Sequence, residues 1–169
     1  MMCDSRLFQP QINEFSKQYM VCATPASSSD TIENISFEIL RYLPTKFTLI
    51  GLSMGGILAM EIIKKVPDRV MKIVLMDTNY KSETAEIKSR RLPQIKLVNE
   101  GLLEDVMCQQ IKNNYLRTDR KNHEIFDLCL RMANDLGKEI FINQSKALST
   151  RKDYKSTLEN IKVPSLIIC

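Results

Sequence analysis

The residues of this sequence best suited to chemistry lie in a short glycine-rich motif. Gly51-Leu52-Ser53-Met54-Gly55 has the pattern G-x-S-x-G and stands between an apolar run, residues 46–50, and a helical pattern, residues 57–65. In that context the pattern predicts a serine on a sharp strand-to-helix turn, with its hydroxyl raised above the sheet edge as a nucleophile. The backbone N–H of Met54 and the helix N-terminus would face an oxyanion formed there.

Other uses of such a turn call for other residues. A dinucleotide site needs G-x-G-x-x-G and a P-loop needs a lysine after its last glycine, and neither pattern is present. A phosphate-binding module therefore rests on the helix N-terminus alone, and a plain connecting turn is the remaining alternative. We expect Gly51 and Gly55 to be required because a side chain at either position would collide with backbone. Gly56 would widen the space behind the serine.

A serine nucleophile needs a base, and the chain has a single histidine, His123. It lies in Asn122-His123-Glu124 at the polar start of a predicted helix, where we expect it to face solvent. A base must come within hydrogen-bonding distance of the serine hydroxyl, and nothing in the pattern directs His123 there. Asp77 follows a predicted strand and is a candidate acid, although such a residue more often binds turn N–H groups.

The composition excludes several other functions. The five cysteines include no C-x-x-C pair, which predicts no metal site and inert buried thiols at Cys22, Cys129 and Cys169. The net charge of +4 is spread along the chain rather than gathered in a nucleic-acid-binding stripe. Arg90-Arg91 and residues 117–121 are expected to be solvated helix ends rather than a phosphate site.

The lengths of the apolar segments indicate the cellular compartment that we expect for the protein. No signal segment is evident, and the uncharged stretch 47–60 is too short to cross a bilayer. A reduced cytoplasmic protein, with no membrane or nucleic-acid partner, is therefore expected. The sequence carries no signal for an oligomeric state. The methionines should fill gaps in the core, although a methionine-lined acyl pocket is an alternative. The methionines considered for these two roles are Met54, Met60, Met107 and Met132.

The elements that must position the serine alternate between strand and helix. Apolar runs at residues 19–23, 46–50, 72–76 and 163–169 predict about four strands, mainly parallel, with helices on their faces. Helical spacing is found over residues 7–19 and 57–65, and also over 32–40, where Asp30 and Glu33 form a predicted capping box. Between residues 80 and 154 only helical stripes occur, with a stop near Gly137. We expect a core (1–79), a helical cap (80–154) and a return to the core (155–169).

With these residues in place, the sequence resembles the α/β-hydrolases, and within them the small carboxylesterase and enol-lactonase type. Similar stretches are residues 2–8, 10–11, 47–56, 67–70, 73–78, 143–148, 151–153 and 161–168. The resemblance implies an α/β-hydrolase fold and a serine hydrolase that acts on a small-molecule carboxylic ester, thioester or lactone without a cofactor. Ser53 would be the nucleophile, and the N–H of Met54 would form part of the oxyanion hole.

The same resemblance implies that the fold is incomplete in this chain. The family's triad runs in the order Ser, acid, His, and its acid and histidine follow the strand ending at Cys169 and the strand after it. The family's first strand and oxyanion loop precede the position of Met1. The chain therefore resembles an α/β-hydrolase cut at both ends. The alternative is a catalytically inactive fragment or split-protein remnant that acts, if at all, by binding a partner.

Overall fold

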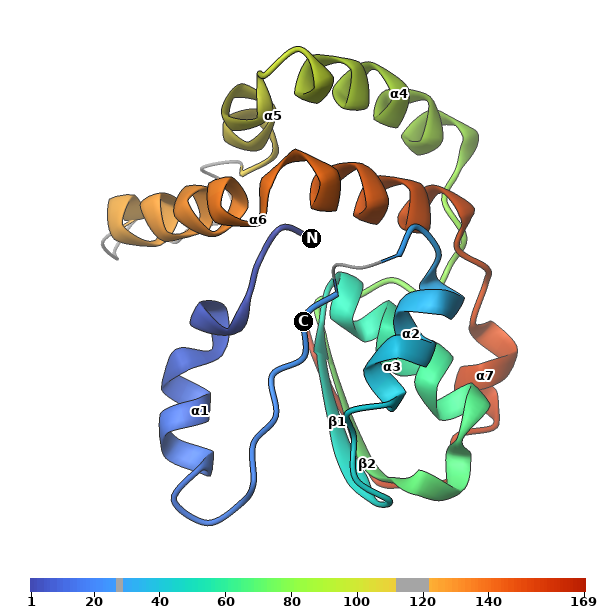
Figure 1. Cartoon of the computed structure of the whole chain (residues 1–169). Coiled ribbons are helices and arrows are strands. Elements are labelled where there is room, and N and C mark those ends of the chain that lie inside the picture. Colours follow the sequence, from blue (N-terminus) through green and yellow to red (C-terminus); the bar gives the residue numbers. More distant parts are fainter. Residues whose placement is uncertain (27–28, 112–121) are drawn as a thin grey trace.

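The computed structural model describes residues 1–26, 29–111 and 122–169 (Figure 1). A parallel sheet contains β1 (Phe47–Leu52), β2 (Val70–Met76) and β3 (Ser165–Ile168), in the order β1-β2-β3. Leu49 lies opposite Ile73, and Ile73 lies opposite Ser165. The central β2 therefore hydrogen-bonds on both sides, and the carboxyl ends of all three strands meet at one edge of the sheet.

The prediction of a strand at residues 19–23 is wrong. The described sheet has three strands, and residues 20–26 carry no assigned strand. Tyr19 and Met20 are 67% and 92% exposed. A strand needs a neighbouring backbone to complete its hydrogen bonds. No described strand pairs with this segment, so its apolar composition does not produce a strand.

Two helices cover one face of the sheet and build the main core. These are α2 (Ile32–Leu40) and α3 (Met54–Lys65), and the apolar face of β1 packs beneath α3. The N-cap of α2 is Thr31, which accepts a hydrogen bond from the N–H of Asn34 at 3.2 Å. The capping box predicted at Asp30 is therefore displaced by one residue. α3 begins at Met54, directly after the serine and earlier than the predicted start at Ile57.

The other side of the sheet is sparsely covered. The 3-10 helix η1 (Ser5–Phe8) leads into α1 (Gln9–Phe15), which holds Pro10 in its first turn as predicted. α1 lies across the sheet from α2 and α3 (Figure 1), and it contains no buried residue. The short helices η2 (Pro67–Arg69) and α7 (Lys155–Glu159) connect the remaining strands.

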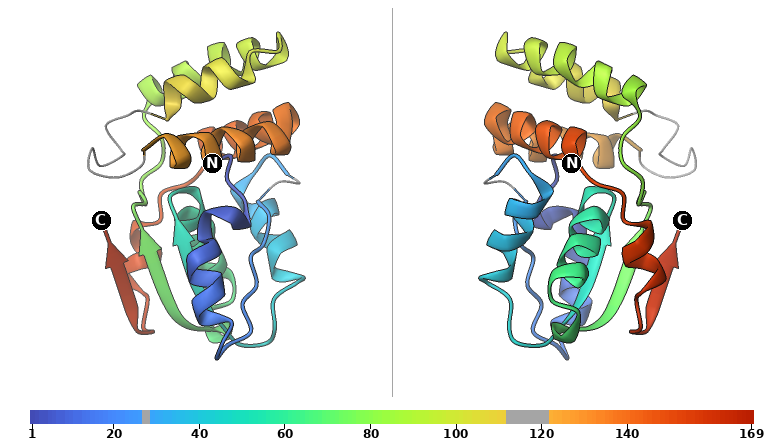
Figure 2. Two further views of the ribbon diagram at one scale, coloured as in Figure 1. Left: turned by 90° about the vertical axis from the view of Figure 1, so that its left-hand side faces the viewer. Right: turned by 90° about the vertical axis from the view of Figure 1, so that its right-hand side faces the viewer.

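Three further helices lie above the carboxyl end of the sheet (Figures 1 and 2). They are α4 (Ala85–Asn99), α5 (Leu103–Gln110) and α6 (Asn122–Thr150). α6 is interrupted at Gly137, whose φ of 79° and ψ of 177° are not helical, at the position where the sequence predicts a stop. These helices form a second apolar cluster that includes Val98, Met107 and Phe141. The four methionines singled out from the sequence are all buried.

A buried cluster of charged side chains connects α4 and the end of α6 to the segment that precedes α4. Glu83, whose side chain is 1% exposed, forms an ion pair with Arg91 of α4. It also pairs with Arg151, directly after α6, with 3.0 Å between the Glu83 Oε1 and the Arg151 Nη1. Burial lowers the pKa of Arg151, and the charge of Glu83 opposes that shift. Both arginines lie inside α4 rather than at a helix end, and the expectation of solvation is right for Arg90 and wrong for Arg91, whose side chain is 12% exposed. Residues 117–121 lie outside the described part.

Candidate active site

Ser53 occupies a strained turn between β1 and α3. Its φ of 52° and ψ of −114° place a non-glycine residue in a region that L-amino acids rarely adopt. The backbone holds this geometry on both sides: the N–H of Ser53 donates to the Met76 carbonyl at 2.9 Å, and its carbonyl accepts from the N–H of Gly56 at 3.0 Å. Ser53 is exposed, whereas Met54 is buried. The turn therefore presents the serine hydroxyl at the carboxyl edge of the sheet.

The start of α3 supplies hydrogen-bond donors next to that hydroxyl. The first N–H groups of an α-helix have no acceptor within the helix, and in α3 they include those of Met54 and Gly55. The positive end of the helix dipole lies at the same place. The turn therefore combines an exposed hydroxyl with N–H groups suited to bind a developing oxyanion.

The glycines of the motif have unequal roles. A Cβ at Gly51 would lie 2.4 Å from the Gly55 carbonyl oxygen and 2.7 Å from the Gly56 nitrogen. Apart from its chain neighbours and the backbone of its own helix, a Cβ at Gly55 would have no atom within 4 Å, so the prediction that a side chain there collides with backbone is wrong. The second crowded position is Gly56, where a Cβ would lie 2.6 Å from the Thr78 side chain.

Thr78 is the residue that sequence reasoning missed near the elbow, which is the turn over residues 51–55 that carries Ser53. Its Oγ1 donates a hydrogen bond to the Ser53 carbonyl at 2.7 Å. The contact fastens the elbow to the end of β2, because Thr78 follows that strand by two residues. The available signal was a threonine directly after the predicted strand end, but no local pattern indicates which backbone carbonyl such a hydroxyl will reach.

Asp77 lies beside the elbow in a conformation of its own. It is exposed, has a φ of 38°, and donates its backbone N–H to the Ile168 carbonyl at 2.8 Å. With Thr78 and Tyr80 it lines a cavity of ≈ 130 Å³, whose other walls are mainly apolar side chains from α3, β2, α7 and β3. Asp77 lies directly after β2 as predicted, and its contact there comes from its backbone N–H. The binding of turn N–H groups by its carboxylate stays a prediction.

His123 is not brought to the elbow. It is the second residue of α6 and is exposed, as the sequence predicts. The start of α6 projects well beyond the sheet, away from the junction of β1 and α3 that carries Ser53 (Figure 1). Within the described residues, the structure therefore gives Ser53 no histidine partner.

The described part of the chain offers little support for other kinds of site. It contains no group of three or more His, Cys, Asp or Glu side chains arranged to hold a metal ion. None of its helices is long and apolar enough to cross a membrane. The prediction of buried thiols is wrong for Cys22 and Cys169, which are exposed, and Cys129 is only partly buried.

Solved structures similar to this one are hydrolases. A thermophilic esterase from Thermogutta terrifontis has a TM-score of 0.80 and 19% identity, over 98% of this chain and 66% of that one. An enol-lactonase from Burkholderia xenovorans has a TM-score of 0.77 and 18% identity, over 98% and 68%. A carboxylesterase structure from Nitrososphaera gargenis has a TM-score of 0.77 and 14% identity, over 98% and 67%. At these identities the likeness shows a shared fold.

The chain covers only part of the length of the solved structures that it resembles. The chain spans about two thirds of the length of the esterase it resembles, 66% by coverage. No curated protein matches the chain significantly in sequence. Residues 15–163 match the family described as alpha/beta hydrolase fold, which is most of the 169 residues. The chain therefore belongs to the alpha/beta hydrolase fold family.

Proposed function

We propose that the protein is a serine hydrolase that cleaves carboxylic esters, thioesters or lactones, with Ser53 as the nucleophile. The observation that carries the proposal is the strained, exposed geometry of Ser53 at the junction of β1 and α3. Such strain is retained where the surrounding contacts hold it and where a function depends on it. The fold neighbours, an esterase and an enol-lactonase, support the ester and lactone substrate classes.

The reaction would follow the usual course for an activated serine. The Ser53 Oγ attacks the acyl carbon while its proton passes to a general base, and the N–H of Met54 binds the oxyanion. Collapse of that intermediate expels the alcohol, thiol or ring oxygen, which takes up the proton. Water then hydrolyses the acyl-enzyme and regenerates the serine. Because His123 is exposed on a distant helix end, we assign the base and its acid to polypeptide outside these 169 residues.

We assign residues 80–154 to a cap over this site. The helices α4, α5 and α6 share an apolar cluster, and the end of α6 also contributes Ala147 and Leu148 to the core between the sheet, α2 and α3. They lie above the sheet edge that carries Ser53 (Figure 2). A cap in that position would shape the acyl pocket and exclude water from the reacting carbonyl.

A fluorophosphonate probe tests the role of Ser53. We expect the product of the complete open reading frame to be labelled at Ser53 and to hydrolyse a p-nitrophenyl ester. Ser53→Ala should abolish both. The control is Ser89→Ala, which removes an exposed serine from regular helix in α4 and should change neither. A folded protein that is not labelled at Ser53 contradicts the proposal.

The sheet edge favours a second candidate, a catalytically inactive unit that binds a partner strand. All four residues of β3 are exposed, including Leu166, Ile167 and Ile168 at 54%, 60% and 46%. An exposed apolar edge strand is a template for pairing with another strand. Light scattering separates the two candidates: self-association that Ile167→Lys abolishes, together with absent probe labelling, supports this alternative. A labelled monomer excludes it.

A further inference from the structure

Two cysteine thiols far apart in the sequence face each other away from the elbow. Cys3 precedes η1, and Cys129 lies in the first half of α6. Each thiol shifts the pKa of the other through a side-chain interaction between them, and both residues are partly buried. The other three cysteines of the chain, Cys22, Cys108 and Cys169, are exposed. The pair is thus the one place where the described structure brings two thiols into contact.

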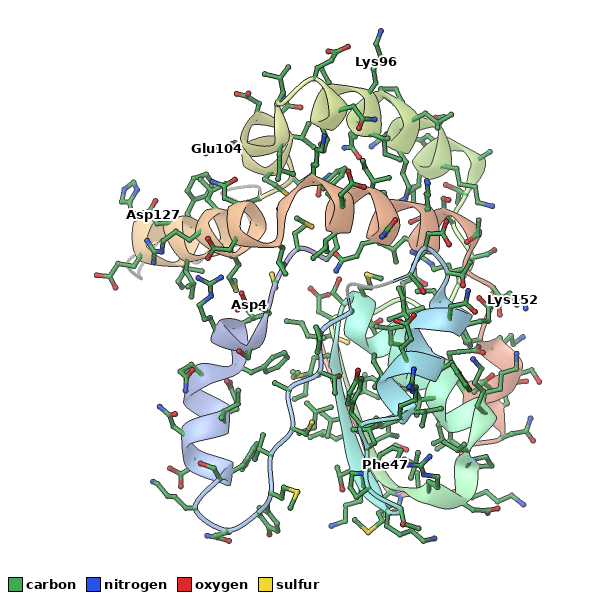
Figure 3. All side chains as sticks on the ribbon, in the orientation of Figure 1. Asp4, Phe47, Lys96, Glu104, Asp127 and Lys152 are labelled. Carbon is green, nitrogen blue, oxygen red and sulfur yellow. The ribbon has the colours of Figure 1, made fainter. Side chains whose placement is uncertain are left out.

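Neighbouring contacts hold Cys3 in register with α6. The N–H of Asp4 donates to the Sδ of Met132 at 3.4 Å, and Arg6 pairs with Asp135 at 2.8 Å. Cys129, Met132 and Asp135 are spaced by three residues and so follow one face of the helix. The segment runs beneath the first half of α6, on which Figure 3 labels Asp127, while Asp4 is labelled on the segment itself. Contacts on the C-terminal side of Cys3 therefore hold its segment against the face of α6 that carries Cys129.

The thiols are also chemically unequal. The hydrogen bond from Cys3 lowers the pKa of Cys129 to about 7, and the same bond, with burial, raises the pKa of Cys3. A thiolate is the attacking species in disulfide exchange, and attack is most efficient when the thiol pKa is near ambient pH. Cys129 therefore has the character of an attacking thiol, and Cys3 has that of a resolving thiol.

We propose that Cys3 and Cys129 form a reversible disulfide by exchange with a low-molecular-weight disulfide such as glutathione disulfide. The Cys129 thiolate attacks one sulfur of glutathione disulfide, breaks its S–S bond and releases one glutathione thiolate. That thiolate takes up the proton of Cys3, and the Cys3 sulfur then attacks Cys129 in the mixed disulfide and releases the second glutathione. The two protein thiols are oxidised, and glutathione disulfide is reduced to two thiols.

The bond would link the segment before η1 covalently to α6. That segment already contacts α6 through Met2, whose N–H donates to the Oε1 of the buried Gln144 at 2.8 Å. The Nε2 of Gln144 donates in turn to the Ala26 carbonyl at 2.8 Å. Oxidation would therefore fix three chain segments that meet beneath α6. The proposal does not depend on Ser53 acting as a nucleophile.

Peptide mapping under non-reducing conditions tests the proposal. The reduced protein is treated with glutathione disulfide, quenched with acid, alkylated and digested. We expect one cross-linked peptide joining Cys3 and Cys129. In a Cys22→Ser/Cys108→Ser/Cys169→Ser background, the intact mass should fall by two hydrogen atoms. Stable glutathione adducts at both cysteines, or cross-links to the exposed cysteines in equal yield, would overturn the proposal.

A second measurement examines the inequality of the two thiols. In the same background, the rate of Cys129 alkylation by iodoacetamide should rise with a midpoint near pH 7. Cys3→Ala removes the hydrogen-bond partner and should move that midpoint towards the ordinary value of about 8.5. Cys22→Ala in the wild-type background is the control and should leave the midpoint unchanged. A midpoint that Cys3→Ala does not move refutes the assigned roles.

Discussion

The crowding at Gly51 gives a sharp test of how the elbow is built. In Gly51→Ala the new Cβ would lie 2.4 Å from the Gly55 carbonyl oxygen. Ordinary contact begins at 3.4 Å, so the turn would have to open by 3.4 − 2.4 = 1.0 Å. The atoms in conflict belong to the backbone at the start of α3 and cannot rotate away. Relief therefore requires β1 and α3 to move apart.

The magnitude follows from two opposing effects. Overpacking of this kind costs about 3 kcal/mol, the upper end of its usual range. Replacing a strand glycine by alanine returns up to about 1 kcal/mol of backbone entropy. The net loss in free energy of unfolding should be about 2 to 3 kcal/mol. For a chain of this size, that lowers Tm by roughly 4 to 12 °C.

Urea unfolding followed by circular dichroism measures the loss, with Gly55→Ala as the matched control. A Cβ at Gly55 points into open space, and alanine is a better helix former than glycine. We expect that variant to change stability by less than about 1 kcal/mol, in the favourable direction. If Gly51→Ala were as stable as the parent, or if both variants lost stability equally, the crowding argument would be refuted.

Further predictions concern strain, buried charge and pH. Ser53→Gly should stabilise the chain by about 1 kcal/mol in urea unfolding by relieving the positive φ, while probe labelling is lost. Glu83→Gln should cost about 3 kcal/mol because it leaves two partly buried guanidinium groups without a carboxylate. Glu86→Gln, in an exposed pair, should cost less than about 0.5 kcal/mol. The hydrogen bonds from Arg6 lower the pKa of Asp4 from its ordinary value. The Asp4 carboxylate therefore contributes stability above its unfolded-state pKa, less than about 1 kcal/mol given its exposure, and this is lost as pH falls through the folded pKa. Asp4→Asn should remove that part of the pH dependence.

Much of the helical architecture could be predicted because local patterns encode it. The stop at Gly137 was evident from the sequence, as was the helix after the serine. α4 was not, because its apolar residues form no clear stripe and Pro93 lies inside it. Its Ile87 and Leu92 remain exposed at 43% and 74%. Where polarity does not follow the helical period, the hydrophobic pattern gives no signal.

Strand pairing and side-chain partnership depend on residues that are distant in the chain. Residues 19–23 have strand-like composition, yet no described strand pairs with them. Arg91 lies in a charged run typical of a solvated surface, but the fold places it against Glu83. Cys129 looks like an apolar helix residue, but Cys3 lies opposite it. Composition predicts the conformational tendency of a segment. Whether that tendency is realised depends on which distant segment of the same chain packs against it.

The sequence by itself determined the elbow, since G-x-S-x-G between an apolar run and a helical pattern specifies a local turn whose geometry depends on neighbouring residues. It also showed that a histidine partner for Ser53 would have to be His123 or lie outside the chain. Only the tertiary structure decided that Gly56 rather than Gly55 is crowded, because the obstacle is Thr78 at the end of another strand. It likewise placed His123 far from the elbow. Contacts between strands and helices arise from packing in three dimensions, which a one-dimensional pattern does not contain.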